Sequence, residues 1–166
     1  DRYEYHENVL SKPLYPETGR YRDFVELMSR RYLVLGKAEG MKIDLGSVAK
    51  GYAGQLVAQM LREHGVQSAL LNLGGNVQTV GTKPDGSPWK IGIKDPQGED
   101  AMMVLSVEDQ AVVTSGGYER YFEQDGVKYH HIIDPSTGHP ANNGLVSVTI
   151  VSVDGTLADG LSTSLF

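Results

Sequence analysis

The chain has 166 residues, of which 40% are hydrophobic, so its size matches one domain and its apolar content is sufficient for a core. Its 15 Lys and Arg against 21 Asp and Glu give a formal net charge of −6, which argues against a nucleic-acid partner because phosphate binding requires a cationic face. The absence of Cys excludes disulfides, thiolate catalysis and zinc–thiolate sites.

Both ends of the chain are expected to continue into a larger protein. Residues 1–40 are polar and Tyr-rich with Pro13 and Pro16, and we interpret them as an irregular lead-in to a core at 41–166. Short strands are predicted at 31–35 and 41–43. The sequence shows no signal peptide and no apolar segment of membrane-spanning length, so a leader or lipid anchor would have to precede Asp1.

A long helix is predicted from Ser47 to His64, because apolar residues recur there at every fourth position from Val48 to Met60. Ser47 is a suitable N-cap residue and Gly65 a suitable residue just beyond the C-terminus. A second helix is predicted over 156–166, with Ala158, Leu161 and Leu165 on one side.

Between the two helices, short apolar runs alternate with turn sequences such as Gly74-Gly75 and Asp134-Pro135. These runs predict strands at 68–73, 76–80, 89–93, 102–107, 111–114, 118–122, 127–133 and 145–153. Many strands at hairpin spacing with few helices predict an α+β fold of largely antiparallel strands, with one long helix and a C-terminal helix.

The start of the long helix, in the stretch from Asp44 to Tyr52, is the first candidate site. Unpaired backbone N–H groups and the positive end of the dipole make a helix start suitable for binding an anion. Lys50 lies in the first turn, where a cation is unfavourable for the helix, so a bound anion would explain it. A surface lysine beside an ordinary cap is the alternative. The order of residues fits neither a Walker loop nor a dinucleotide fingerprint.

Two glycine pairs form the second candidate feature. Gly74 and Gly75 follow an apolar strand and could offer a flat surface to an aromatic ring, or could simply form a tight turn. The stretch from Thr114 to Gly117 repeats this feature and adds hydroxyls, including that of Ser115, which could bind a phosphate or a base edge.

The C-terminal helix carries the third feature. Asp159 and Thr163 are spaced i, i+4 and therefore share one helical face. A carboxylate and a hydroxyl suit Mg²⁺, which binds few protein oxygens and completes its coordination with water and phosphate. Helix capping by Asp159 is the alternative.

The fourth feature is the segment from His130 to Gly138. Side chains alternate between the two faces of a strand, so only one of His130 and His131 can point into a given pocket. A hairpin with two structural histidines is an equally open interpretation of these residues alone.

Taken in order, the motifs DLGSVAKGY, LNLGGN, TSGGY, HHIIDPSTGHP and ADGLSTSLF resemble those of the ApbE-like FAD:protein FMN transferases, over about residues 41–166. The resemblance implies a T-fold-related architecture and a Mg²⁺-dependent enzyme. Such an enzyme transfers FMN from FAD to a Thr or Ser hydroxyl of a target flavoprotein and releases AMP. It also implies an extracytoplasmic, periplasmic location with a lipid anchor to a membrane. The earlier half of the family's sequence has no match in this chain.

The same resemblance implies roles for individual residues. It makes His131 the catalytic residue and Ile133 an FAD contact, and it places flavin-nucleotide contacts at Asp44 and Lys50. Metal ligands would be Asp159, Thr163 and the main-chain carbonyl of Ser47, which would bring the last helix against the start of the long one. Ser162 stands where some members carry a second Asp. To the FAD-binding set we add the residues of the glycine-rich motifs, Gly74, Gly75 and Ser115.

The expected chemistry fits these residue types. Transfer at a pyrophosphate requires charge neutralisation more than covalent help from the protein, which Mg²⁺, a helix N-terminus and Lys50 would supply. A neutral His near pH 7 suits the activation of a weakly nucleophilic hydroxyl. Three alternatives remain open: an FAD pyrophosphatase that uses water as acceptor, a non-catalytic flavin-binding protein, and a structural module that binds no nucleotide.

Overall fold

The computed structural model describes residues 44–166, of which Leu45–Phe166 form one compact unit. The predicted lead-in and the strands predicted at 31–35 and 41–43 lie outside the described residues. The unit has α+β architecture with antiparallel strand pairing, as predicted. Its elements are α3 (Ala49–Glu63), β1 (Ala69–Leu73), β2 (Asn76–Val80), β3 (Trp89–Lys94), β4 (Ala101–Val107), β5 (Ala111–Gly116), β6 (Tyr121–Gln124), β7 (Val127–His130), β8 (Ser147–Ser152) and α4 (Gly155–Ser164).

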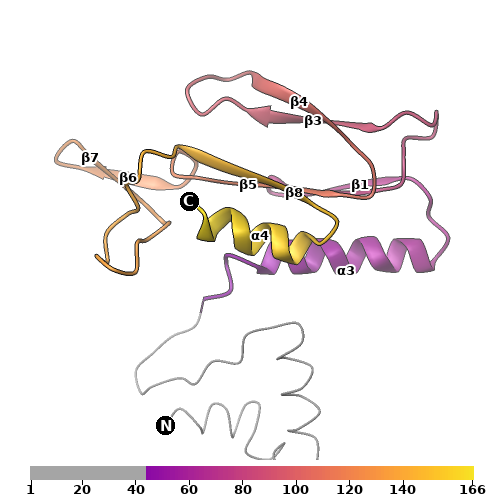
Figure 1. The fold of residues 1–166 in the computed structure, drawn as a ribbon, viewed down its shortest axis with the longest axis horizontal. Coiled ribbons are helices and arrows are strands. Elements are labelled where there is room, and N and C mark those ends of the chain that lie inside the picture. The colour runs from indigo at the N-terminus through magenta and orange to yellow at the C-terminus, as the bar shows by residue number, and fades with distance from the viewer. Residues whose placement is uncertain (1–43) are drawn as a thin grey trace, which may run out of the picture. The chain divides into compact units, whose positions relative to one another are not determined.

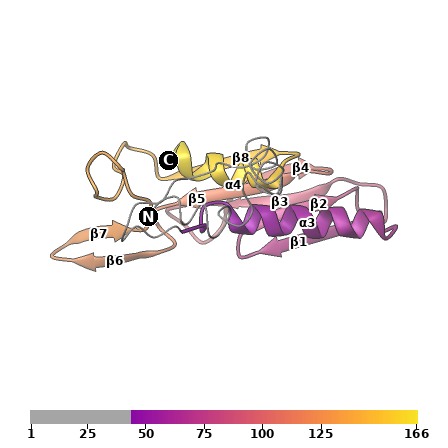
Figure 2. The ribbon, with the colours of Figure 1, turned by 90° about the horizontal axis from the view of Figure 1, so that it is seen from below.

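A four-stranded antiparallel sheet with the order β1-β2-β5-β8 forms the middle of this unit (Figure 1). Helices α3 and α4 cover one face of the sheet, and the β3–β4 hairpin covers the other (Figure 1). The β6–β7 hairpin projects beyond the sheet, and Figure 2 shows it from the helix side. No helix in residues 44–166 combines the length and apolar character required to cross a membrane.

Alternation along β2 and β5 divides the core into two clusters. On the hairpin side, Val77 and Val112 pack with Ile91, Ile93 and Val107. On the helix side, Ala111 and Val113 pack with Ala158 of α4. Every residue of β2 is buried, because this strand has a neighbouring strand on each edge and a packed layer on each face.

The two ends of α3 differ in how well the sequence predicted them. Gly65 adopts φ +81°, and hydrogen bonds from Gly65 N to Arg62 O and from Val66 N to Leu61 O complete the expected glycine-terminated end. The prediction of Ser47 as N-cap is wrong, because the cap position is Val48 and no side chain caps the helix. The Leu45 carbonyl instead accepts from Val48 N and Ala49 N, at 3.0 and 2.8 Å.

The buried faces of both helices consist of small residues. They are Gly51, Gly54 and Ala58 in α3, and Gly155, Ala158, Asp159 and Ser162 in α4. Of the three apolar residues predicted on one side of the last helix, only Ala158 is buried, since Leu161 and Leu165 are 36% and 55% exposed. The reason is steric: a Cβ on Gly51 would overlap the carbonyl oxygen of Gly155, so only small residues fit where the helices approach.

Three predicted strands are shorter or shifted. The strand predicted at 118–122 is β6 at Tyr121–Gln124, because residues 117–120 form a turn and bend after β5. The strand predicted at 127–133 ends at His130, beyond which Ile133 forms only an isolated bridge to Pro140. The strand predicted at 145–153 is β8 at Ser147–Ser152, which matches the six-residue length of its partner β5.

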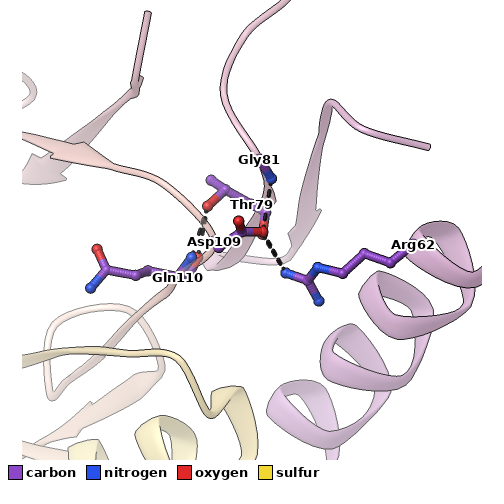
Figure 3. Close-up of polar contacts among 5 residues, drawn as sticks. All are labelled: Arg62, Thr79, Gly81, Asp109 and Gln110. Atoms are coloured by element: carbon purple, nitrogen blue, oxygen red, sulfur yellow. Dashed lines mark hydrogen bonds and ion pairs between the residues drawn. The ribbon is translucent and has the colours of Figure 1, made fainter. Parts of the chain in front are cut away.

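The C-terminal end of α3 is tied to the sheet by a polar corner (Figure 3). Asp109 Oδ1 accepts from Arg62 Nη2 and from Gly81 N, both at 2.8 Å, and Thr79 Oγ1 bonds with the backbone of Gln110. The Gly81 N–H and the Arg62 guanidinium hold the pKa of Asp109 below its usual value. Both charged side chains remain exposed to solvent, so this ion pair is a surface interaction.

Candidate functional site

Asp159 is a buried carboxylate at the contact between α4 and α3. It is 3% exposed, and its Oδ2 accepts a hydrogen bond of 2.7 Å from the backbone N–H of Gly51. The capping alternative is wrong, because α4 is capped by Asp154, which accepts from Leu157 N at 2.9 Å. No Lys, Arg or His within residues 44–166 pairs with Asp159. Since buried charges are normally paired or bound to a metal, Asp159 is suited to hold a cation.

Hydroxyl groups surround the next turn of α4. Ser115 Oγ, at the end of β5, lies 2.8 Å from Ser162 Oγ and 3.3 Å from Thr163 Oγ1. Ser162 Oγ also donates to the main-chain oxygen of Asp159 at 2.9 Å. All of these donor atoms are oxygens, which Mg²⁺ prefers. The described residues contain no cluster of three or more His, Asp or Glu side chains placed so that they could hold a metal ion together. A cation at this position would therefore depend on one carboxylate, hydroxyls and carbonyls.

The Gly51 peptide is held on both sides. Its N–H donates to Asp159, and its carbonyl oxygen accepts from Gln78 Nε2 at 3.0 Å. The Gln78 side chain fits against Gly54 and Gly155, where added Cβ atoms would overlap its amide. The strand β2 therefore fixes the peptide that orients the Asp159 carboxylate.

The predicted residues at the start of α3 lie next to this junction. Lys50 is half-buried in the first turn, directly before Gly51, and it pairs with no acidic group in the described part of the chain. Val48 lies against Gly160 of α4, so the last helix packs on the start of the long one as the metal prediction requires. Ser47 and Asp44 are exposed in the segment that precedes the helix.

The two adjacent histidines differ in their hydrogen bonds. His130 Nε2 lies 3.1 Å from the Ala141 carbonyl, and its Nδ1 accepts from Ile132 N at 3.3 Å, so both ring nitrogens are used. The ring of His130 also packs edge-on against Phe166. His131 Nδ1 lies 3.2 Å from the Arg120 carbonyl oxygen, which can only accept. Neutral His131 therefore carries its proton on Nδ1 and leaves the Nε2 lone pair available to act as a base.

A pocket of about 570 Å³ connects His131 to α4. It is lined by the segments His131–Pro135 and Ala141–Asn143 and by three residues at the chain's end, Thr163, Ser164 and Phe166. Three predicted site residues, His131, Ile133 and Thr163, thus share one pocket, whereas His130 does not line it. In the pocket wall, hydrogen bonds from Ser136 hold the pKa of Asp134 below its usual value.

Gly74 and Gly75 form the two-residue turn between β1 and β2. Both have positive φ, +60° and +89°, and Gly75 N donates to Asn72 Oδ1 at 2.9 Å. A hairpin turn of this kind requires positive φ at both positions, so the turn alone explains the two glycines. Their contact with FAD stays a prediction, and neither residue lines the pocket.

Sequence reasoning missed two polar residues of β2, Asn76 and Gln78. Both are buried in a strand that is covered on both faces, and they occupy alternate positions of NVQTV. Two polar residues with a period of two inside a central strand were the available signal, because burial of a polar side chain requires a partner.

Comparison with known proteins gives the family of this chain. Residues 11–166 match the model of the ApbE family, and the chain belongs to this family. It is 46% identical over 137 residues to the FAD:protein FMN transferase of Treponema pallidum. This match covers 76% of the present chain and 38% of the Treponema protein. A relative of the same name from Klebsiella pneumoniae is 48% identical over 129 residues, with 76% and 39% covered.

Solved structures agree with this assignment. The ApbE protein of Thermotoga maritima superimposes with a TM-score of 0.72 at 49% identity, covering 76% of this chain and 41% of that one. The flavin transferase ApbE of Vibrio cholerae gives a TM-score of 0.65 at 40% identity, covering 74% and 39%. The chain therefore spans about two fifths of the length of the relatives that it matches.

Proposed function

We propose that the protein containing this chain is a Mg²⁺-dependent FAD:protein FMN transferase that modifies a Thr or Ser hydroxyl of a target flavoprotein. The observation that carries the proposal is the buried Asp159 carboxylate, which has no cationic partner in residues 44–166. It lies one helical turn from Thr163, and Thr163 lines the same pocket as His131. Membership of the ApbE family and relatives named FAD:protein FMN transferase support it.

In this proposal, Asp159, Thr163 and the Ser47 carbonyl hold the metal. A bound Mg²⁺ supplies charge neutralisation at the FAD pyrophosphate. The Lys50 ammonium group binds the phosphates, with Asp44 as a further contact of the nucleotide. The N–H groups of Val48, Ala49 and Gly51 are already bonded within the protein, so the expected anion site of free N–H groups at the helix start is not carried over. Ile133, Gly74, Gly75 and Ser115 complete the FAD-binding set.

His131 acts as the general base. Its Nδ1 is held by the Arg120 carbonyl, so Nε2 can take the proton of the acceptor hydroxyl. The hydroxyl oxygen then forms a bond to the phosphorus of the FMN moiety. The bond between this phosphorus and the bridging oxygen breaks, and AMP leaves with the electron pair.

Incubation of the full-length protein with FAD, Mg²⁺ and candidate acceptor proteins tests the proposal. The expected result is an FMN-sized mass increase on the acceptor and release of AMP, both of which stop when EDTA is added. Formation of free FMN and AMP without acceptor labelling would identify an FAD pyrophosphatase. Binding of FAD without cleavage would identify a flavin carrier, and no binding of FAD would leave a structural module.

We also propose an extracytoplasmic, periplasmic location with a lipid anchor to the membrane, by analogy with the family. Cell fractionation tests this directly. Recovery of the protein in the membrane fraction, accessible to protease added from the periplasmic side, is the expected result.

A further inference from the structure

A buried amide on β2 has no hydrogen-bond partner. Asn76 is 2% exposed, and neither its Oδ1 nor its Nδ2 is hydrogen-bonded. Buried polar side chains are almost always paired, and leaving one unpaired is costly. The remaining unpaired buried side-chain atom within residues 44–166 is Trp89 Nε1, a single donor packed against the apolar cluster of the β3–β4 hairpin. Asn76 is different because it leaves both a donor and an acceptor unsatisfied.

Strand geometry places Asn76 on the helix side of the sheet. Val77 packs into the cluster under the β3–β4 hairpin, so its neighbours Asn76 and Gln78 face α3 and α4. Gln78 confirms this orientation, since it bonds to the Gly51 carbonyl. The carbonyl of Thr79, further along β2, accepts from Arg62 near the other end of α3. The strand and the helix therefore run in the same direction, and Asn76 lies toward the start of α3.

The pairing of β2 with β5 places Asn76 near α4 as well. Val77 pairs with Val112 and Gln78 with Ala111, and extending this register by one residue sets Asn76 beside Val113. Val113 packs against Ala158, the residue before Asp159. Asn76 thus lies between the start of α3 and the part of α4 that carries the buried carboxylate.

We propose that the Asn76 amide is a ligand-binding group that contacts the pyrophosphate of FAD together with its hydrated metal. Nδ2 would donate to a phosphate oxygen, and Oδ1 would accept from a metal-bound water. A pyrophosphate offers only acceptors and a hydrated cation only donors, so a group with one of each matches the pair. The inference rests on the proposed function, and within it assigns Asn76 a role in binding the FAD pyrophosphate.

The test compares Asn76→Leu with Thr79→Val in the full-length protein. Leu has the same branched shape and number of side-chain heavy atoms as Asn and removes the unpaired amide, so the melting temperature should stay the same or rise. The Kd values for FAD and for ADP in Mg²⁺ should both increase by about tenfold or more, and that for riboflavin should not change. Thr79 is 1% exposed on the same strand, but its hydroxyl is bonded to Gln110. Thr79→Val should therefore lower the melting temperature and leave the FAD affinity unchanged.

Several outcomes would overturn the inference. A lower melting temperature with unchanged FAD and ADP affinity would show that Asn76 is only structural. Weaker riboflavin binding with unchanged ADP binding would overturn the assignment to the pyrophosphate. If the wild-type protein binds neither FAD nor ADP, the proposed function fails as well, whereas wild-type binding that survives Asn76→Leu refutes this inference alone.

A measurement on the wild-type protein covers the case in which Asn76→Leu does not fold. The side-chain amide resonances of Asn76 in an NMR titration should shift when ADP and Mg²⁺ are added together. Resonances that stay in place at saturating ligand would overturn the inference.

Discussion

Helix α3 meets an aspartate at each end, and both aspartates accept a hydrogen bond from a glycine N–H. At the C-terminal end, the exposed Asp109 binds Gly81 N at 2.8 Å and forms an ion pair with Arg62 (Figure 3). At the N-terminal end, the buried Asp159 binds Gly51 N at 2.7 Å, and no cation of residues 44–166 neutralises it. At the first junction, the carboxylate is paired by groups of the protein itself. The second leaves a buried carboxyl group without a cationic partner in these residues, an arrangement that a bound metal ion would complete.

The largest expected effect is that of removing the charge at the buried junction. Asp159→Asn keeps an oxygen that can accept from Gly51 N but removes the charge that would hold Mg²⁺. We expect Mg²⁺-dependent transfer to fall by about a hundredfold or more, while the melting temperature stays the same or rises. The matched change at the exposed junction, Asp109→Asn, should leave transfer unchanged. Full activity of Asp159→Asn would reduce Asp159 to a structural residue.

The second expected effect separates the two histidines. His131→Ala should slow transfer by about a hundredfold, the usual effect of losing a general base, and should leave FAD affinity nearly unchanged. His130→Ala should instead lower the free energy of unfolding by about 1–3 kcal/mol, because it leaves the Ile132 N–H and the Ala141 carbonyl without their partner. Transfer assays and urea unfolding of both variants measure this. A slower transfer step in His130→Ala than in His131→Ala would reverse the assignment.

The third effect concerns the small residues of the helix contact. In Gly51→Ala, the new Cβ would overlap the Gly155 carbonyl and the Asp159 side chain, so we expect a destabilisation of about 1–3 kcal/mol. The comparison is Gly65→Ala at the other end of α3. No atom lies near that Cβ, but φ is +81°, so only backbone strain of about 1 kcal/mol is expected. Urea unfolding gives both values, and equal destabilisation would argue against close helix packing.

The smallest effect is the pH dependence of the exposed junction. Because the folded-state pKa of Asp109 is lowered, its stabilising contribution is present above the unfolded-state value, near 3.8, and is lost as the pH falls through the folded-state pKa. At pH 7, Asp109→Asn should lower the free energy of unfolding by about 1 kcal/mol or less, as is usual for exposed ion pairs. The difference between variant and wild type should shrink as the pH falls below 3.8 and disappear below the folded-state pKa. A difference that persists there would come from packing rather than charge.

The local elements of this protein follow from short-range features of its sequence. The helix that ends at Gly65, the turn at Gly74-Gly75 and the turn at Asp134-Pro135 each depend on residues a few positions apart. Apolar periodicity, which also depends on residues a few positions apart, identified both helices and eight strands. The prediction that Asp159 and Thr163 share one helical face needed only the i, i+4 spacing of a helix.

Contacts between residues distant in sequence decided the rest. Periodicity identified two helices but not their buried faces, because the glycine and alanine face of α3 is buried only where α4 and β2 approach it. From the residues of the last helix alone, capping was the favoured interpretation of Asp159, and the metal role came from the family resemblance. The structure excludes capping, because Asp154 caps α4 and Asp159 instead bonds to Gly51, 108 residues away. The metal role stays a prediction. The functions of Gln78 and Asn76 depend on which layer covers each face of β2, and only tertiary packing determines that.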